Sequence, residues 1–74
     1  MAQLLDFGSV HEAALNLASN GTTVTVPHLV AVLERDGIGC ADAELRATVA
    51  DLETRRYLAF TGQWDGDEKI YSVL

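Results

Sequence analysis

The chain has 74 residues, of which 49% are hydrophobic, so it is long enough for one small globular domain with a thin core. Its 11 acidic and 5 basic residues give a formal net charge of −6, which argues against a general polyanion binder or a polybasic membrane module. The single cysteine, Cys40, excludes an internal disulfide and a site with several cysteine ligands. The sequence has no apolar run of membrane-spanning length and no signal-peptide pattern, and we therefore expect a cytoplasmic protein.

The first predicted element is a helix over residues 9–19, preceded by an apolar lead-in over residues 1–8. Apolar residues recur at helical spacing in this helix, and Ser9 opens a Ser-x-x-Glu capping box. An Asn-Gly pair, which tolerates positive φ, follows and ends the helix. The alternative is one longer helix that starts near Ala2 and bends at Gly8.

The middle of the chain predicts a short strand followed by a second helix. The β-branched run over residues 22–26 favours a strand. Pro27 suits the first position of the helix, where its missing N–H costs nothing, and an Asp-Gly pair at 36–37 ends it. We expect Ile38, in the connector that follows, to reach the core. The buried stripe of this helix would be Leu29, Val32 and Leu33.

A third helix is predicted from about residue 41 to residue 55. Apolar residues recur there at spacings of four and three, as in an amphipathic helix that packs on a core. Acidic residues in its first turn and arginines in its last turn suit the helix dipole. The predicted central core residues are Leu45, Val49 and Leu52.

The C-terminal segment predicts a β-hairpin with strands over residues 57–61 and 69–73 and a turn at Asp65-Gly66. A two-residue turn there opposes Leu58 to Val73 and Phe60 to Tyr71. All four side chains then point to one face, which we expect to be buried.

This order of elements resembles the winged helix-turn-helix family over residues 9–74. The most specific stretch is residues 45–58, where a leucine late in the helix leads through a short polar turn into an apolar strand, and residues 25–33 are similar to the family's second helix. The resemblance implies an α+β fold, mostly α, with three helices, a short strand after the first helix and a C-terminal two-stranded hairpin, the wing. Arg56 stands where the family often has glycine, so we expect a differently shaped turn. The fold serves DNA readers, protein adaptors and dimerisation modules alike, so it does not by itself imply a function.

In the DNA-binding members of this family, the exposed face of the third helix enters the major groove. Here Arg46 would read a base, while phosphate contacts would come from the other basic residues, Arg35, Arg55, Arg56 and Lys69. However, the tip of the wing, residues 64–69, has three acidic residues and one basic residue, which disfavours contact with phosphates. A dimeric DNA-binding transcription regulator is therefore our second hypothesis.

The sequence has no motif that indicates catalysis or a cofactor. His28 and Cys40, with Asp36 as a third ligand, lack the short spacing of a zinc site, and we interpret Cys40 as a small residue that closes a turn. The acidic groups are interpreted as solvated. We therefore expect no enzyme activity, no metal, no cofactor and no small-molecule substrate.

Our first hypothesis is a small, acidic, non-enzymatic regulatory protein that binds another protein through the wing and the third helix. The candidate contact residues are Trp64, Asp65, Asp67, Asp42 and Ala47. Trp64 is either an interface anchor or a lid that folds back over the core. One form of this hypothesis is an acidic inhibitor that engages a basic partner, and another is self-association. The other hairpin face, with Tyr57, Ile70 and Leu74, is apolar enough to be covered by the lead-in or by a second copy.

Overall fold

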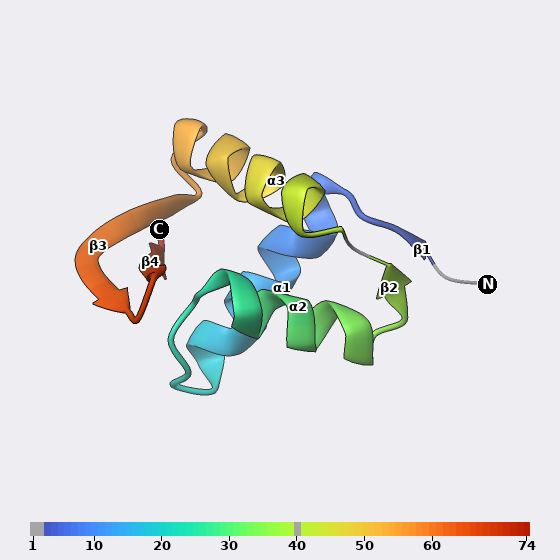
Figure 1. Cartoon of the computed structure of the whole chain (residues 1–74), viewed down its shortest axis with the longest axis horizontal. Coiled ribbons are helices and arrows are strands. Elements are labelled where there is room, and N and C mark those ends of the chain that lie inside the picture. The colour runs from blue at the N-terminus through green and yellow to red at the C-terminus, as the bar shows by residue number, and fades with distance from the viewer. Residues whose placement is uncertain (1–2, 40) are drawn as a thin grey trace.

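Three helices pack together, and a β-hairpin projects from one end of the molecule (Figure 1). The computed structural model describes residues 3–39 and 41–74. The elements in chain order are β1 (Gln3–Leu4), α1 (Phe7–Ser19), α2 (Val26–Arg35), β2 (Ile38–Gly39), α3 (Asp42–Thr54), β3 (Leu58–Asp65) and β4 (Glu68–Val73). The expected α+β fold, mostly helical with a C-terminal antiparallel hairpin, is confirmed, and it is compatible with a winged helix.

Helix α1 begins two residues earlier than expected, because Asp6 rather than Ser9 caps it. Asp6 has extended backbone angles, and its carboxylate accepts a hydrogen bond from the backbone N–H of Ser9 at 2.7 Å. The capping box predicted at Ser9 was therefore wrong, and Gly8 lies within the helix. A single helix running from the lead-in is also excluded, because Gln3–Leu4 forms β1, which pairs in parallel with β2 at the end of the molecule opposite the hairpin (Figure 1).

The strand expected after the first helix is present, although its pairing is confined to Val24. The backbone N–H of Tyr71 donates to the carbonyl of Val24 at 2.8 Å, so β4 lies between β3 and this one-residue bridge. The strand is this short because Thr25 already caps α2 through its hydroxyl, which accepts from the N–H of His28 at 3.4 Å.

The core lies between the three helices and the base of the hairpin. The predicted stripe of α3 is confirmed, since Leu45, Val49 and Leu52 are no more than 1% exposed. Ile38 reaches the core as expected, at 8% exposure. The other buried apolar residues of α2 and β3 include Leu29, Val32, Leu33 and Leu58.

The register at the base of the hairpin is confirmed, but it changes toward the tip. Leu58 opposes Val73 and Phe60 opposes Tyr71, whereas a bulge between Phe60 and Trp64 shifts the rest of the ladder. Gly62 permits the bulge with a φ of +87°. The turn consequently falls at residues 66–67, one residue later than predicted.

Burial of all four facing side chains was wrong for Phe60. Leu58 is buried and Tyr71 and Val73 are partly buried, but Phe60 is 37% exposed. Phe60 instead packs against Trp64 and the ammonium group of Lys69, both in the hairpin itself, and it is not part of the core cluster.

Arg56 takes the backbone conformation that glycine usually supplies after a helix. Its φ is +65°, its N–H donates to the carbonyl of Glu53, and the N–H of Tyr57 donates to the carbonyl of Leu52. These are the two hydrogen bonds of a Schellman motif. The different turn shape expected from the missing glycine was therefore wrong, because arginine adopts the left-handed conformation instead.

Candidate functional site

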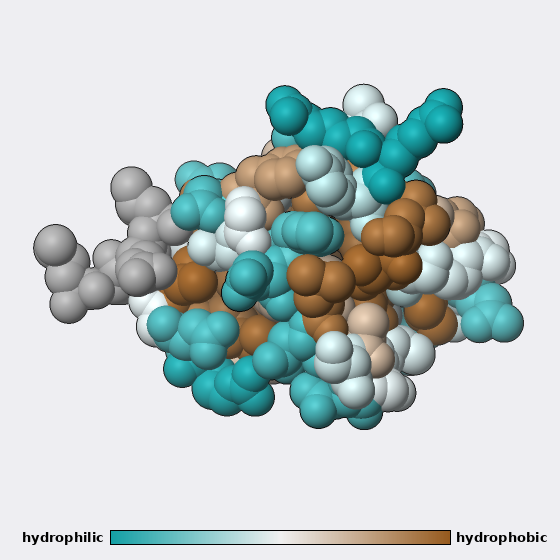
Figure 2. All heavy atoms as spheres, turned by 180° about the vertical axis from the view of Figure 1, so that it is seen from behind, coloured by the Kyte–Doolittle hydropathy of each residue, from teal (hydrophilic) through white to brown (hydrophobic). Residues whose placement is uncertain are grey.

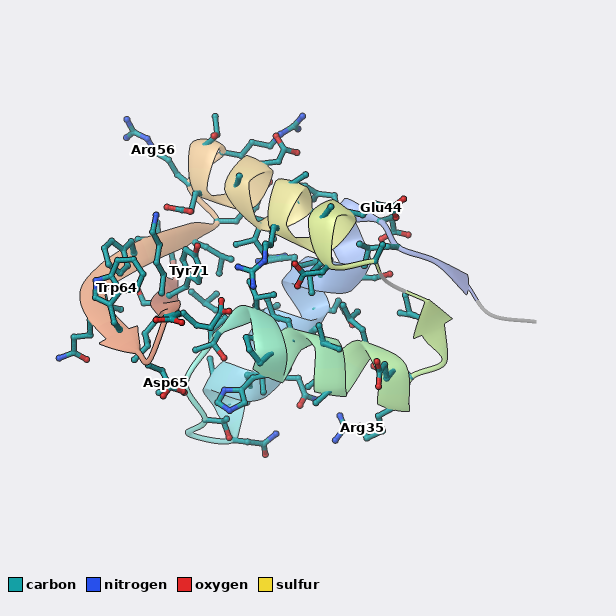
Figure 3. All side chains as sticks on the ribbon, viewed as in Figure 1. Arg35, Glu44, Arg56, Trp64, Asp65 and Tyr71 are labelled. Carbon is teal, nitrogen blue, oxygen red and sulfur yellow. The ribbon has the colours of Figure 1, made fainter. Side chains whose placement is uncertain are left out.

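A pocket of about 200 Å³ lies between the wing, the first half of α3 and the start of α2. Its apolar walls are Val26, Val49, Trp64 and Tyr71. Its charged walls are Arg46, Asp67, Glu68 and Lys69. Trp64 and Tyr71 lie beside each other on the hairpin, with Tyr71 nearer the helices (Figure 3). The pocket is therefore an aromatic and aliphatic recess with charged groups of both signs.

Arg46 joins α3 to the wing across this pocket. Its Nε donates to Oδ2 of Asp42 at 2.8 Å, and its two terminal nitrogens donate to the carboxylate of Glu68 at 3.1 and 2.8 Å. The hydrogen bonds to Glu68, and then the one to Asp42, raise the pKa of the Arg46 guanidinium above its ordinary value. The side chain that the DNA hypothesis needs is thus held by two carboxylates of its own chain.

The other basic residues do not gather into one surface. Arg35 contacts Asp36 at 4.0 Å and Arg55 contacts Asp51 at 3.2 Å. Figure 3 shows Arg35 beyond the end of α2 and Arg56 at the end of α3, on opposite sides of the molecule. Of the five predicted DNA-contact residues, only Arg46 and Lys69 line the same pocket.

The structure brings together some of the predicted protein-contact residues and separates others. Trp64 and Asp67 line the pocket directly, and Asp42 adjoins it through Arg46. Asp65 is exposed in β3 beside the turn, and Ala47 is exposed on α3, but neither lines the pocket. The candidate site is therefore the pocket and its rim, not the whole of the predicted surface.

Trp64 does not fold back over the core. It is 56% exposed and packs against Phe60, with the two rings 5.5 Å apart and edge to face. The ammonium group of Lys69 lies 5.3 Å from the centre of the Phe60 ring. The bulge brings these three side chains together, so the outer half of the wing carries an exposed aromatic surface.

Sequence reasoning missed the parts of the site that depend on how the wing meets the helices. Glu68 and Arg46 are 22 residues apart, and no local spacing pairs them. By contrast, the contact between Asp42 and Arg46 has the i,i+4 spacing of a helical ion pair. Tyr71 was assigned to the core face, yet it lines the pocket, and burial together with the nearby carboxylate of Glu53 raises the pKa of its hydroxyl.

A second aromatic cluster covers part of the other hairpin face. The Phe7 ring packs edge to face on Tyr57 at 5.2 Å, the His11 ring lies 4.9 Å from Tyr57, and the Arg55 guanidinium lies 5.3 Å from the centre of the Phe7 ring. The expectation that the lead-in covers this face is thus met at Tyr57. Seen from behind, the molecule still shows apolar side chains gathered across its middle and toward the wing (Figure 2).

Among the residues that the structure describes, no group of three or more potential ligands could hold a metal ion. Cys40, which we considered as a zinc ligand and interpreted as a turn residue, lies outside the described residues. Within the described ranges, no helix has the length and apolar character needed to cross a membrane. Comparison of the chain with protein-family models, with curated proteins and with solved structures finds no match.

Proposed function

We propose that this chain is a small, non-enzymatic winged-helix regulatory protein that acts by binding another protein through its wing and α3. The observation that carries the proposal is Trp64, which is 56% exposed on a projecting hairpin at the rim of a pocket. Tryptophan is the residue type most enriched among interface anchors, and such anchors characteristically pack into or beside pockets.

The energy that Trp64 offers to a partner is substantial. A tryptophan side chain buries up to about 250 Å². Covering the exposed 56% would remove roughly 140 Å² from water, which is worth about 3.5 kcal/mol at about 25 cal/mol per Å². A protein interface can recover this free energy, whereas the free chain leaves it unused.

The charges support a protein partner over DNA. Arg46, the residue best placed on α3 to read a base, is engaged by Asp42 and Glu68. Binding a base would require breaking these contacts and bringing their carboxylates close to phosphates. Non-specific DNA affinity comes almost wholly from phosphate neutralisation, which a chain of net charge −6 supplies poorly.

The test compares three immobilised proteins: the wild type, Trp64→Ala and Leu15→Ala. Leu15 is a matched control because it is an exposed apolar residue, 42% accessible, on α1 and outside the pocket. We expect proteins in a cell extract that the wild type and Leu15→Ala retain and that Trp64→Ala loses, measured by quantitative mass spectrometry.

Two results would contradict the proposal. One is that no retained protein depends on Trp64. The other is tight binding of a labelled random duplex, followed by fluorescence anisotropy, with a steep dependence on salt and loss on Arg46→Ala. That second result would restore the DNA-binding hypothesis.

A further inference from the structure

We propose that the pocket beside Trp64 receives an arginine side chain from a basic segment of the partner. This inference rests on the proposed function and names the chemistry of its partner. It is carried by the size of the pocket, by the groups that line it and by the distribution of charge around it.

The pocket has the size of a single side chain. At about 200 Å³ it is smaller than the roughly 300–1,000 Å³ of typical small-molecule sites. It lies between the outer part of the wing and the helices, where a side chain extending from another polypeptide can enter. A single inserted residue, anchored at the rim by Trp64, is the occupant that this volume fits.

The lining suits a guanidinium group. Trp64 offers an aromatic ring and Asp67 offers a carboxylate, while the Glu68 carboxylate already accepts from Arg46. A guanidinium stacks on aromatic rings and donates to carboxylates in the same plane, which an ammonium group does less well. The apolar walls formed by Val26 and Val49 would contact the methylene stem of the inserted arginine.

The two basic residues of the pocket do not oppose this occupant strongly. The charge of Arg46 is offset by Asp42 and Glu68, and the ammonium group of Lys69 lies over the Phe60 ring. Asp67 makes no ion pair among the described residues, and its neighbour Asp65 makes none either. The rim toward the wing tip is therefore net acidic.

The charge of the whole chain selects a basic partner over a second copy. Two copies that met at their wing tips would each bring a net charge of −6 and an acidic rim. Like charges brought together at an interface are unfavourable, whereas an acidic surface steers a basic partner toward it. The same argument excludes a phosphate or another anion as the natural occupant.

The experiment titrates the chain with a short, end-blocked peptide that carries three arginines and, separately, with its citrulline counterpart. Citrulline keeps the shape of arginine but removes the charge. Trp64 is the single tryptophan of the chain, so its fluorescence reports directly on the pocket, and amide NMR shifts report on the rest of the surface. We expect saturable changes at the pocket with the arginine peptide and affinity about fivefold weaker for the citrulline peptide.

Two variants with the same change of charge separate the pocket from general attraction. Asp67→Asn removes a carboxylate from the pocket, while Glu34→Gln removes one from an exposed position on α2 that does not line it. We expect Asp67→Asn to lower the affinity for the arginine peptide by about twofold to fivefold and Glu34→Gln to leave this affinity unchanged.

Three outcomes would overturn the inference. The first is equal affinity for the citrulline and arginine peptides. The second is an equal loss of affinity in the two charge variants. The third is a dimer of the free chain, seen by sedimentation, that Trp64→Ala dissociates. If any of these occurs while Trp64→Ala still loses a protein in the capture experiment, the proposed function stands and the arginine pocket falls. If the capture experiment also shows no dependence on Trp64, both fall.

Discussion

Truncation of Leu52 to alanine should remove about half of the stability of this domain. Leu52 is 0% exposed at the centre of the α3 stripe, so the change deletes buried methyl groups and leaves a cavity. Leu→Ala at such sites costs about 2–5 kcal/mol. A 74-residue domain has a free energy of unfolding of about 4–11 kcal/mol, so roughly half of the total is at stake.

The measurement is equilibrium urea unfolding of the wild type, Leu52→Ala and Leu15→Ala, followed by circular dichroism. Leu15→Ala makes the same chemical change at a side chain that is 42% exposed, and it should cost no more than about 1 kcal/mol. We expect the urea midpoint of Leu52→Ala to fall to about half that of the wild type. Equal midpoints for the two variants would refute the packing of α3 against the core.

Three further predictions concern the turn after α3, the cap of α1 and the contact between wing and helix. Arg56→Gly should raise the free energy of unfolding by up to about 1 kcal/mol relative to Arg56→Ala, because only glycine takes φ of +65° without strain; equal urea midpoints would contradict this. The hydrogen bonds from Ser9 hold the pKa of Asp6 below its ordinary value of 3.8. The stabilisation by the ionised carboxylate is therefore complete above that pH and is lost as the pH falls through the lowered pKa. Between neutral and acidic pH, the melting temperature of Asp6→Asn should consequently fall less than that of the wild type. Glu68→Gln should release the wing from Arg46 and speed amide hydrogen exchange in β4, while Glu34→Gln should not; equal protection in both would mean that the ion pair does not hold the wing.

The helices and the core could be predicted because local periodicity decides them. The spacing of Leu45, Val49 and Leu52 identifies the buried face of α3 without knowledge of its partners. The base of the hairpin was predictable for a related reason, since alternation at Leu58 and Phe60 fixes the register where one strand face meets the helices.

The errors lie where two local signals compete or where the signal is absent. Asp6 and Ser9 are both good capping residues, and the extended backbone at Asp6 decides between them. Gly62 permits a bulge, but nothing in the alternation of the strand requires one. The exposure of Phe60 follows from its packing on Trp64 and Lys69 within the hairpin, across a bulge that no local pattern records.

The candidate site was predictable only in part, because it forms between segments distant in the sequence. The acidic wing tip and the tryptophan beside it indicated Asp67 and Trp64 as contact residues, and both line the pocket. The residues that give the pocket its chemistry, Glu68 and Tyr71, were assigned to other roles, because the contact of Glu68 with α3 and that of Tyr71 with Val24 depend on the placement of the wing.

The placement of Arg46 links the fold to the choice between the two functions. A winged helix that reads DNA needs a cation on α3 that is free to approach the groove. In this chain the same cation bridges α3 and β4 through Asp42 and Glu68, so it helps to hold the wing over the pocket. The contacts that engage Arg46 therefore also shape the recess beside Trp64. A partner that uses this recess needs the bridge intact, whereas DNA would need it broken.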